Sequence, residues 1–85
     1  MELEKIFKAL SSKTRLEILK FLAGGEKSVS AIVSRFRLTQ PTISHHLKVL
    51  SQVGLVISRR YRQSVLYSLN RELLKCIAKE IVFDE

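Results

Sequence analysis

The chain has 85 residues, a length that supports one domain with a small hydrophobic core. Apolar residues make up 46% of it, which indicates a globular protein and excludes intrinsic disorder. The formal net charge is +7, and the absence of a run of about 18 apolar residues excludes a membrane-spanning helix.

The first part of the sequence predicts three helices in succession. Residues 3–10 place Leu3, Ile6, Phe7 and Leu10 at the spacing of a single helix face. Ser12 is a good N-cap for a second helix, which we expect to end at Gly24-Gly25. Ser28 or Ser30 can cap a short third helix. The residues expected inside the second and third helices are Leu16, Ile18, Leu19, Leu22, Ala31, Ile32, Val33 and Phe36.

A fourth helix, a β-hairpin and a last helix complete the predicted order. Thr39 caps the fourth helix, Pro41 falls in its first turn, where a missing N–H costs nothing, and Gly54 ends it. Two β-type runs, 55–61 and 64–69, predict a hairpin although the usual Asn-Gly turn is absent. Asn70 then caps a helix whose apolar side comprises Leu73, Leu74, Ile77, Ile81 and Val82. We predict a mainly α single domain over residues 1–85, in the order α-α-α-α-β-β-α.

The fourth helix divides into an apolar side and a small polar side. At 100° per residue, Leu47 and Leu50 fall within about 40° of Ile43 and are predicted core, with His46 at the edge of this stripe. The opposite side presents short hydrogen-bonding residues, whereas a helix that only faced water would more often show Glu/Lys pairs. Such residues suit base edges in a major groove of DNA, which an α-helix can enter.

The adjacent histidines suggest neither a metal site nor a catalytic site. His45 and His46 diverge by about 100°, whereas helical metal ligands converge at i, i+4 spacing. No Cys, Asp or Glu lies nearby to complete a metal site or to orient a histidine beside Ser44. We therefore predict no metal and no enzyme activity, since no acid–base pair is available.

Positive charge is concentrated in the middle of the chain. From Lys27 to Arg71 there are eight Lys or Arg residues and no Asp or Glu, whereas both flanking segments mix the two signs. A basic surface that serves only solubility usually mixes signs as well. We interpret the acid-free stretch as a nucleic-acid footprint. A membrane surface fits less well, because the basic residues do not fall on one amphipathic helix.

Three segments, ALSSKTRLEILKFL, LTQPTISHHLKVLSQVGLV and RRYRQSVLYSL, together resemble the ArsR-type (arsenic-resistance repressor) winged helix-turn-helix regulators. The likeness runs from Ala9 to about Leu69. It implies that the fourth helix is the DNA recognition helix, that the hairpin is the wing, and that the first and last helices form a homodimer interface. Members of this family are prokaryotic repressors that bind operator DNA as dimers and often release it when a metal or another signal binds.

The sequence departs from the metal-sensing members of that family. Many of them have Cys-Val-Cys at the start of the third helix, where this chain reads Ser28-Val29-Ser30, and hydroxyls are poor ligands for soft metals. Others place Asp and His ligands on the last helix, which here contains no histidine. We predict no metal sensing and no cofactor, and the effector stays unknown. Cys76 is either a thiol switch across the dimer or a packing residue, and its apolar helix favours packing.

The sequence thus predicts a cytosolic, sequence-specific double-stranded DNA-binding regulator that acts as a dimeric repressor. The residues expected to read bases are Gln40, Thr42, Ser44 and His45, with Thr39 and Lys48 on phosphates. The expected wing contacts to backbone or minor groove are Arg59, Arg60, Arg62 and Gln63. The alternatives are a winged-helix protein-interaction module and an RNA-binding domain. The charge pattern disfavours the protein-interaction module, because a protein-binding wing has no reason to exclude acidic residues over so long a stretch.

Apolar stripes on the terminal helices predict the dimer contact. One small domain has little core to cover two such helices, so we expect part of each stripe to be buried against a second copy. The expected dimer contacts are Leu3, Ile6, Phe7, Leu10, Leu74, Ile77 and Ile81. A two-fold pair would set two recognition helices roughly 34 Å apart, one turn of DNA.

Overall fold

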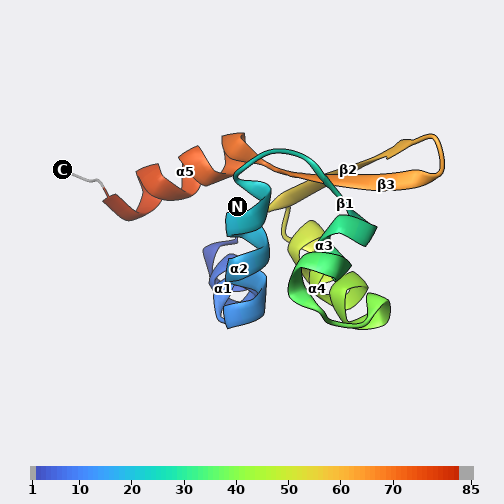
Figure 1. Ribbon diagram of the computed structural model, residues 1–85. Coiled ribbons are helices and arrows are strands. Elements are labelled where there is room, and N and C mark those ends of the chain that lie inside the picture. The colour runs from blue at the N-terminus through green and yellow to red at the C-terminus, as the bar shows by residue number, and fades with distance from the viewer. Residues whose placement is uncertain (1, 83–85) are drawn as a thin grey trace.

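The structure, a computed structural model, describes residues 2–82 and confirms the predicted order with one extra strand. The helices are α1 (Leu3–Leu10), α2 (Lys13–Leu22), α3 (Val29–Phe36), α4 (Gln40–Gln52) and α5 (Arg71–Val82). The strands are β1 (Lys27–Ser28), β2 (Val56–Tyr61) and β3 (Ser64–Leu69). Helices α3 and α4 followed by the β2–β3 hairpin form the expected winged helix-turn-helix (Figure 1).

Four helices begin where the sequence places a capping side chain. The side chains of Ser12, Ser28, Thr39 and Asn70 each accept a hydrogen bond from the backbone N–H three residues later. Of the two serines proposed for α3, Ser28 is therefore the cap. Gly54, which follows α4, has φ +82°, a left-handed conformation that glycine adopts without strain. These local hydrogen bonds explain why the helix starts were predictable.

A single cluster of apolar side chains holds the helices against the sheet. The buried members come from all five helices, from β2 and from the preceding Leu55: Ile6, Ala9, Ile18, Leu22, Ile32, Ile43, Leu47, Leu50, Leu55, Val56 and Ile77. The prediction that Leu16 is buried is wrong, because its side chain is 42% exposed. It stands about 200° around α2 from Ile18, which is fully buried, so the two cannot share a face.

The sheet has three antiparallel strands in the order β1-β3-β2. The sequence did not indicate β1, since it has only two residues, which pair with Tyr67 and Leu66 of β3. The hairpin turns through Arg62-Gln63 with Arg62 at φ 57°, a left-handed conformation in place of the missing glycine. The hairpin and α5 point away from the body in opposite directions, which makes the molecule 46 Å long and about 20 Å thick (Figure 1).

Helix α5 is only partly covered by its own chain. Ile77 is 6% exposed and belongs to the core, whereas Ile81, one turn further out, is 57% exposed. Cys76 is exposed, so the interpretation of this cysteine as a packing residue is wrong within the single chain. The side chain of Val82 lies outside the described residues. Among residues 2–82, no helix has the length and apolar character needed to cross a membrane.

Candidate nucleic-acid interface

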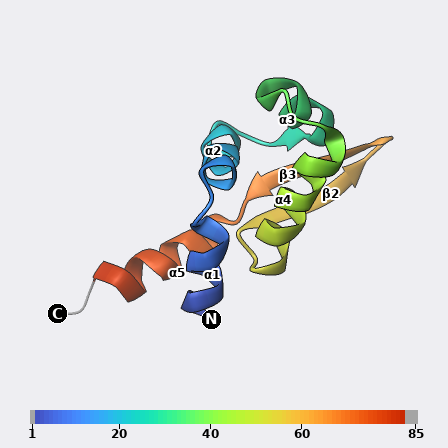
Figure 2. The same cartoon turned by 90° about the horizontal axis from the view of Figure 1, so that it is seen from below.

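Helix α4 presents the polar face that the sequence predicted. Ile43, Leu47 and Leu50 are buried, with at most 1% of each residue exposed. The predicted contact residues of this helix are all exposed: Gln40, Thr42, Ser44, His45 and Lys48. Packing of the apolar stripe against the core therefore fixes which side of α4 a ligand can reach. In Figure 2 this helix crosses in front of the hairpin strands, with α1 to its left and the hairpin turn to its right.

The start of α4 is held by two threonines. The Thr39 hydroxyl donates to the Thr42 hydroxyl over 2.9 Å, and the Thr39 oxygen accepts from the Thr42 backbone N–H over 3.4 Å. Pro41 occupies the first turn, as predicted. The Thr39 side chain thus caps the helix in the free protein, and its expected contact with phosphate stays a prediction.

His46 connects α4 to the junction between α1 and α2, which we call the α1–α2 corner. The Arg15 guanidinium donates through Nε to the Ala9 carbonyl (2.6 Å) and lies 3.2 Å through Nη1 from Nδ1 of His46. An arginine only donates, so Nδ1 must be the unprotonated, accepting nitrogen. Partial burial of the ring, the positive charge of Arg15 and neighbouring His45 lower the pKa of His46 below its ordinary value of 6.5.

Because the pKa of His46 is lowered, we expect the folded protein to lose stability as the pH decreases. The unfolded chain takes up the His46 proton first, so the free energy of unfolding should drop below about pH 6.5 and be unaffected by His46 at higher pH. Chemical denaturation between about pH 7.5 and 5.5 avoids the range in which carboxylates titrate. His46→Gln keeps an acceptor for Arg15 without titrating and should flatten the curve. An equal pH dependence in the two proteins would contradict this prediction.

The wing arginines have different surroundings. Arg59 forms a bidentate ion pair with Glu26, with Nε–Oε2 at 2.7 Å and Nη2–Oε1 at 2.9 Å. These hydrogen bonds lower the pKa of Glu26 and raise that of Arg59. Arg62 lies over the Tyr61 ring, 5.3 Å from its centroid, near the hairpin turn. Glu26 stands one residue before the acid-free stretch, and sequence reasoning did not connect it with the wing.

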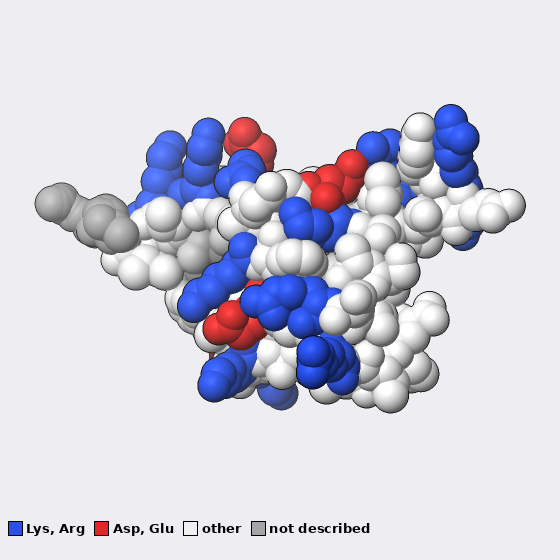
Figure 3. Space-filling view, in the orientation of Figure 1, with Lys and Arg blue, Asp and Glu red and all other residues white. Residues whose placement is uncertain are grey.

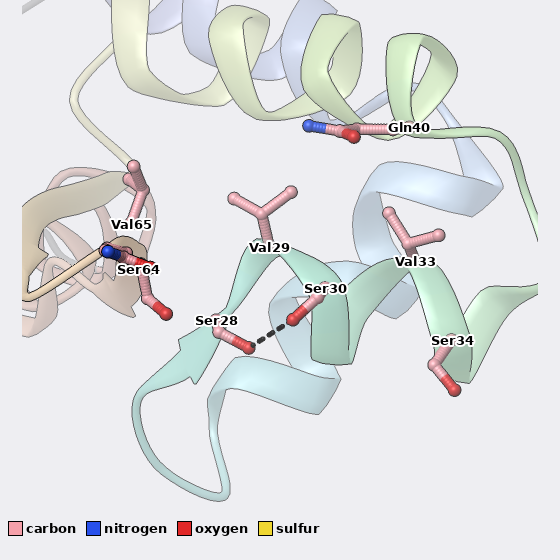
Figure 4. Close-up of a pocket in the computed structure, with 9 residues that line it drawn as sticks. Ser28, Val29, Ser30, Val33, Ser34, Gln40, Ser64 and Val65 are labelled. Carbon is pink, nitrogen blue, oxygen red and sulfur yellow. Dashed lines mark hydrogen bonds between the residues drawn. The ribbon is translucent and has the colours of Figure 1, made fainter.

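A cleft of about 380 Å³ lies between the hairpin turn and the start of α4. It is lined by Gln40 of α4, by Gln63 and Ser64 of the hairpin, and by serines and valines of α3 (Figure 4). Two residues predicted to contact DNA, Gln40 and Gln63, thus line one cleft. The hydroxyls of Ser28 and Ser30 lie 3.2 Å apart, and both residues line this cleft. They stand at the positions where the metal-sensing members of the resembled family have cysteines. Ser28 also caps α3 there.

The two histidines do not converge. Their ring centroids are 5.8 Å apart, His45 is exposed, and His46 is turned toward Arg15. Among residues 2–82, no three His, Cys, Asp or Glu side chains are grouped to hold a metal ion. The expected lack of metal sensing stays a prediction.

Basic side chains are unevenly spread over the surface. In the view of Figure 3, Lys and Arg gather at the tip of the hairpin, along α5 and over the α1–α2 corner. The acidic atoms on this face lie in three places: on α5, near the middle, and among the basic side chains over α1 and α2. The hairpin tip is therefore basic in three dimensions as well as in sequence, while α1 and α2 add cations that the charge pattern of the middle segment did not include.

The sequence is similar to that of known regulators. Residues 12–58 match the profile described as bacterial regulatory protein, arsR family. The transcriptional repressor SdpR of Bacillus subtilis is 38% identical over 73 residues, which cover 86% of this chain and 81% of that protein. An arsenical resistance operon repressor of Staphylococcus xylosus is 40% identical over 80 residues, covering 94% and 77% of the two chains.

The structure is also similar to a solved one. The homodimeric winged helix-turn-helix DNA-binding domain Mb0332 from Mycobacterium bovis, described as a possible ArsR-family transcriptional regulator, superposes with a TM-score of 0.79 at 32% identity. The match covers 95% of this chain and 82% of that domain. The likeness thus includes the terminal helices as well as the helix-turn-helix and the wing.

Proposed function

Since the chain belongs to the arsR family of bacterial regulatory proteins, we propose that it regulates transcription by binding operator DNA as a homodimer. Its most direct action is repression, by occupying the operator, as the names of its repressor relatives suggest. It would act in the cytoplasm, where the DNA is. We propose no cofactor, because Ser28 and Ser30 offer hydroxyls where metal-sensing relatives have thiolates.

The exposed polar face of α4 beside the wing is the observation that supports this function best. Base reading needs side chains that donate or accept hydrogen bonds on a helix narrow enough to enter the major groove. Gln40, Ser44 and His45 meet that requirement, and Lys48 supplies a charge on the same side. Arg60 and Arg62 of the hairpin would reach the neighbouring DNA backbone. Arg59 is less available for such a contact, because it is paired with Glu26.

Selection of bound duplexes from a random pool tests the proposal. We expect a two-fold symmetric sequence with half-sites one turn of DNA, about 10 base pairs, apart. If a dimer neutralises about 8 phosphates, log K for the selected duplex should fall with log salt at a slope of about −7. A slope near zero would instead favour a protein-interaction module, and tighter binding to RNA of the same sequence would favour an RNA-binding domain.

Two substitutions on α4 separate base reading from phosphate binding. His45→Ala is expected to relax the preference at one position per half-site, at a cost of about 1–3 kcal/mol against the correct base. Lys48→Ala, on the same face, serves as the matched control and should weaken binding to all duplexes about equally. The measurement is affinity for the selected duplex and its single-base variants. An unchanged preference in His45→Ala would show that this residue does not read a base.

A further inference from the structure

A basic groove lies on the side of α4 that faces away from the wing. It has a volume of about 560 Å³ and is lined by residues of α4, of α1 and of the start of α2. Lys5 and Lys8 of α1, Arg15 of α2 and His45 of α4 contribute its basic side chains, and no acidic residue among residues 2–82 lines it. The other lining residues are Ala9, Val49, Gln52 and Val53. We call these eight residues the α1–α4 groove.

One charge of the α1–α4 groove is held in place before any ligand arrives. Arg15 donates to the Ala9 carbonyl over 2.6 Å and lies 3.2 Å from Nδ1 of His46, so its guanidinium bridges the end of α1 and the middle of α4. Neither partner carries a negative charge, so the charge of Arg15 is not neutralised by them. A cation fixed in this way loses little conformational entropy when it binds an anion.

The two lysines stand one helical turn apart on α1. Lys5 forms an i,i+3 ion pair with Glu2 at 3.3 Å, but both side chains are at least 70% exposed. Such a pair in water contributes about 0–1 kcal/mol, so it does not hold Lys5 away from a stronger anion. Both lysine ammonium groups can therefore turn into the groove at little cost.

A recognition helix in the major groove has one sugar–phosphate strand on each side. The wing lies on one side of α4, and the α1–α4 groove lies on the other, with His45 on the border between the base-reading face and the groove. We propose that the α1–α4 groove binds the phosphates of the DNA strand opposite the wing, through Lys5, Lys8 and Arg15. This proposal rests on the proposed function and adds three cations that lie outside the acid-free stretch of the sequence.

Salt dependence of DNA binding tests the groove. The variant Lys5→Gln/Lys8→Gln removes four charges per dimer, and each phosphate contact contributes about 0.9 to the slope of log K against log salt, so the slope should shrink by about 3–4. The control Lys20→Gln/Lys75→Gln removes the same charge at exposed positions that do not line the groove, and its Lys20 is likewise paired with an i−3 glutamate. The control slope should change by less than about 1. The probes are the duplex selected above and a scrambled duplex of equal length.

The outcomes separate this inference from the proposed function. If the unaltered protein binds duplex DNA with a steep salt slope, and the groove variant lowers that slope while the control does not, the groove binds phosphate. Equal slopes for the two variants would show that the α1–α4 groove does not bind phosphate, and would leave the proposed function intact. Ethylation of single phosphates in the selected duplex gives a second readout. Ethylated positions that weaken the unaltered protein but not the groove variant must lie on the strand opposite the wing, and their absence would also overturn the proposal.

Discussion

Replacing Ile81 with glutamate is expected to separate the dimer into folded monomers that bind the operator weakly. Ile81 is 57% exposed on α5, and Phe7 of α1 is 44% exposed, so both terminal helices leave large apolar side chains uncovered by their own chain. A second copy would cover them. A carboxylate placed in that contact would lose water without gaining a partner, at a cost of several kcal/mol. A monomer reads one half-site only, so we expect operator affinity to fall about a hundredfold or more.

Sedimentation and circular dichroism together test this prediction. Ile57→Glu is the matched control, because Ile57 is 51% exposed but belongs to strand β2 and not to a terminal helix. The control should remain a dimer, whereas Ile81→Glu should sediment as a monomer with an unchanged helical spectrum. If Ile81→Glu sediments as a dimer, or binds the operator as a monomer with full affinity, these helices do not form the interface.

Replacing Ile77 with glutamate should have a different and larger effect, the unfolding of the domain. Ile77 is 6% exposed and packs in the core of its own chain, so the carboxylate would be buried even in the monomer. The penalty of several kcal/mol is a large part of the stability of an 85-residue domain. Circular dichroism should show a loss of helix. The control Ile77→Val removes one methylene, should cost about 0.5–1.5 kcal/mol and should remain folded.

The contrast between these two isoleucines revises the predicted interface. Both belong to one helical stripe, yet Ile77 is 6% exposed and Ile81 is 57% exposed. Ile6 on α1 is likewise 3% exposed and belongs to the core. A folded protein carrying Ile77→Glu with normal helix content would show that α5 packs differently from the arrangement described here. The dimer contact we now propose therefore centres on Phe7 and Ile81, flanked by the half-buried Leu3, Leu10 and Leu74.

The sequence by itself determined the helices, the hairpin and the orientation of α4. A cap and the N–H that it accepts are three residues apart, as for Ser12 with Arg15 and Asn70 with Leu73, so no distant segment is needed to form them. The polar face of α4 follows equally from local geometry, because once Ile43 is buried, rotation by 100° per residue places His45 on the opposite side. The predicted DNA-contact set on α4 came from this reasoning.

Only the tertiary structure decided which charges are paired and which apolar residues are covered. Glu26 and Arg59 are 33 positions apart, and Arg15 and His46 are 31 apart, so neither pair could be found from spacing within one element. Ile77 and Ile81 are indistinguishable by periodicity, and their burial differs because α5 leaves the body of the domain between them. The α1–α4 groove arises in the same way, since its cations come from three helices that meet only when the core packs. Local propensity selects the elements, but the distances between charges on different elements are set by how the shared core brings those elements together.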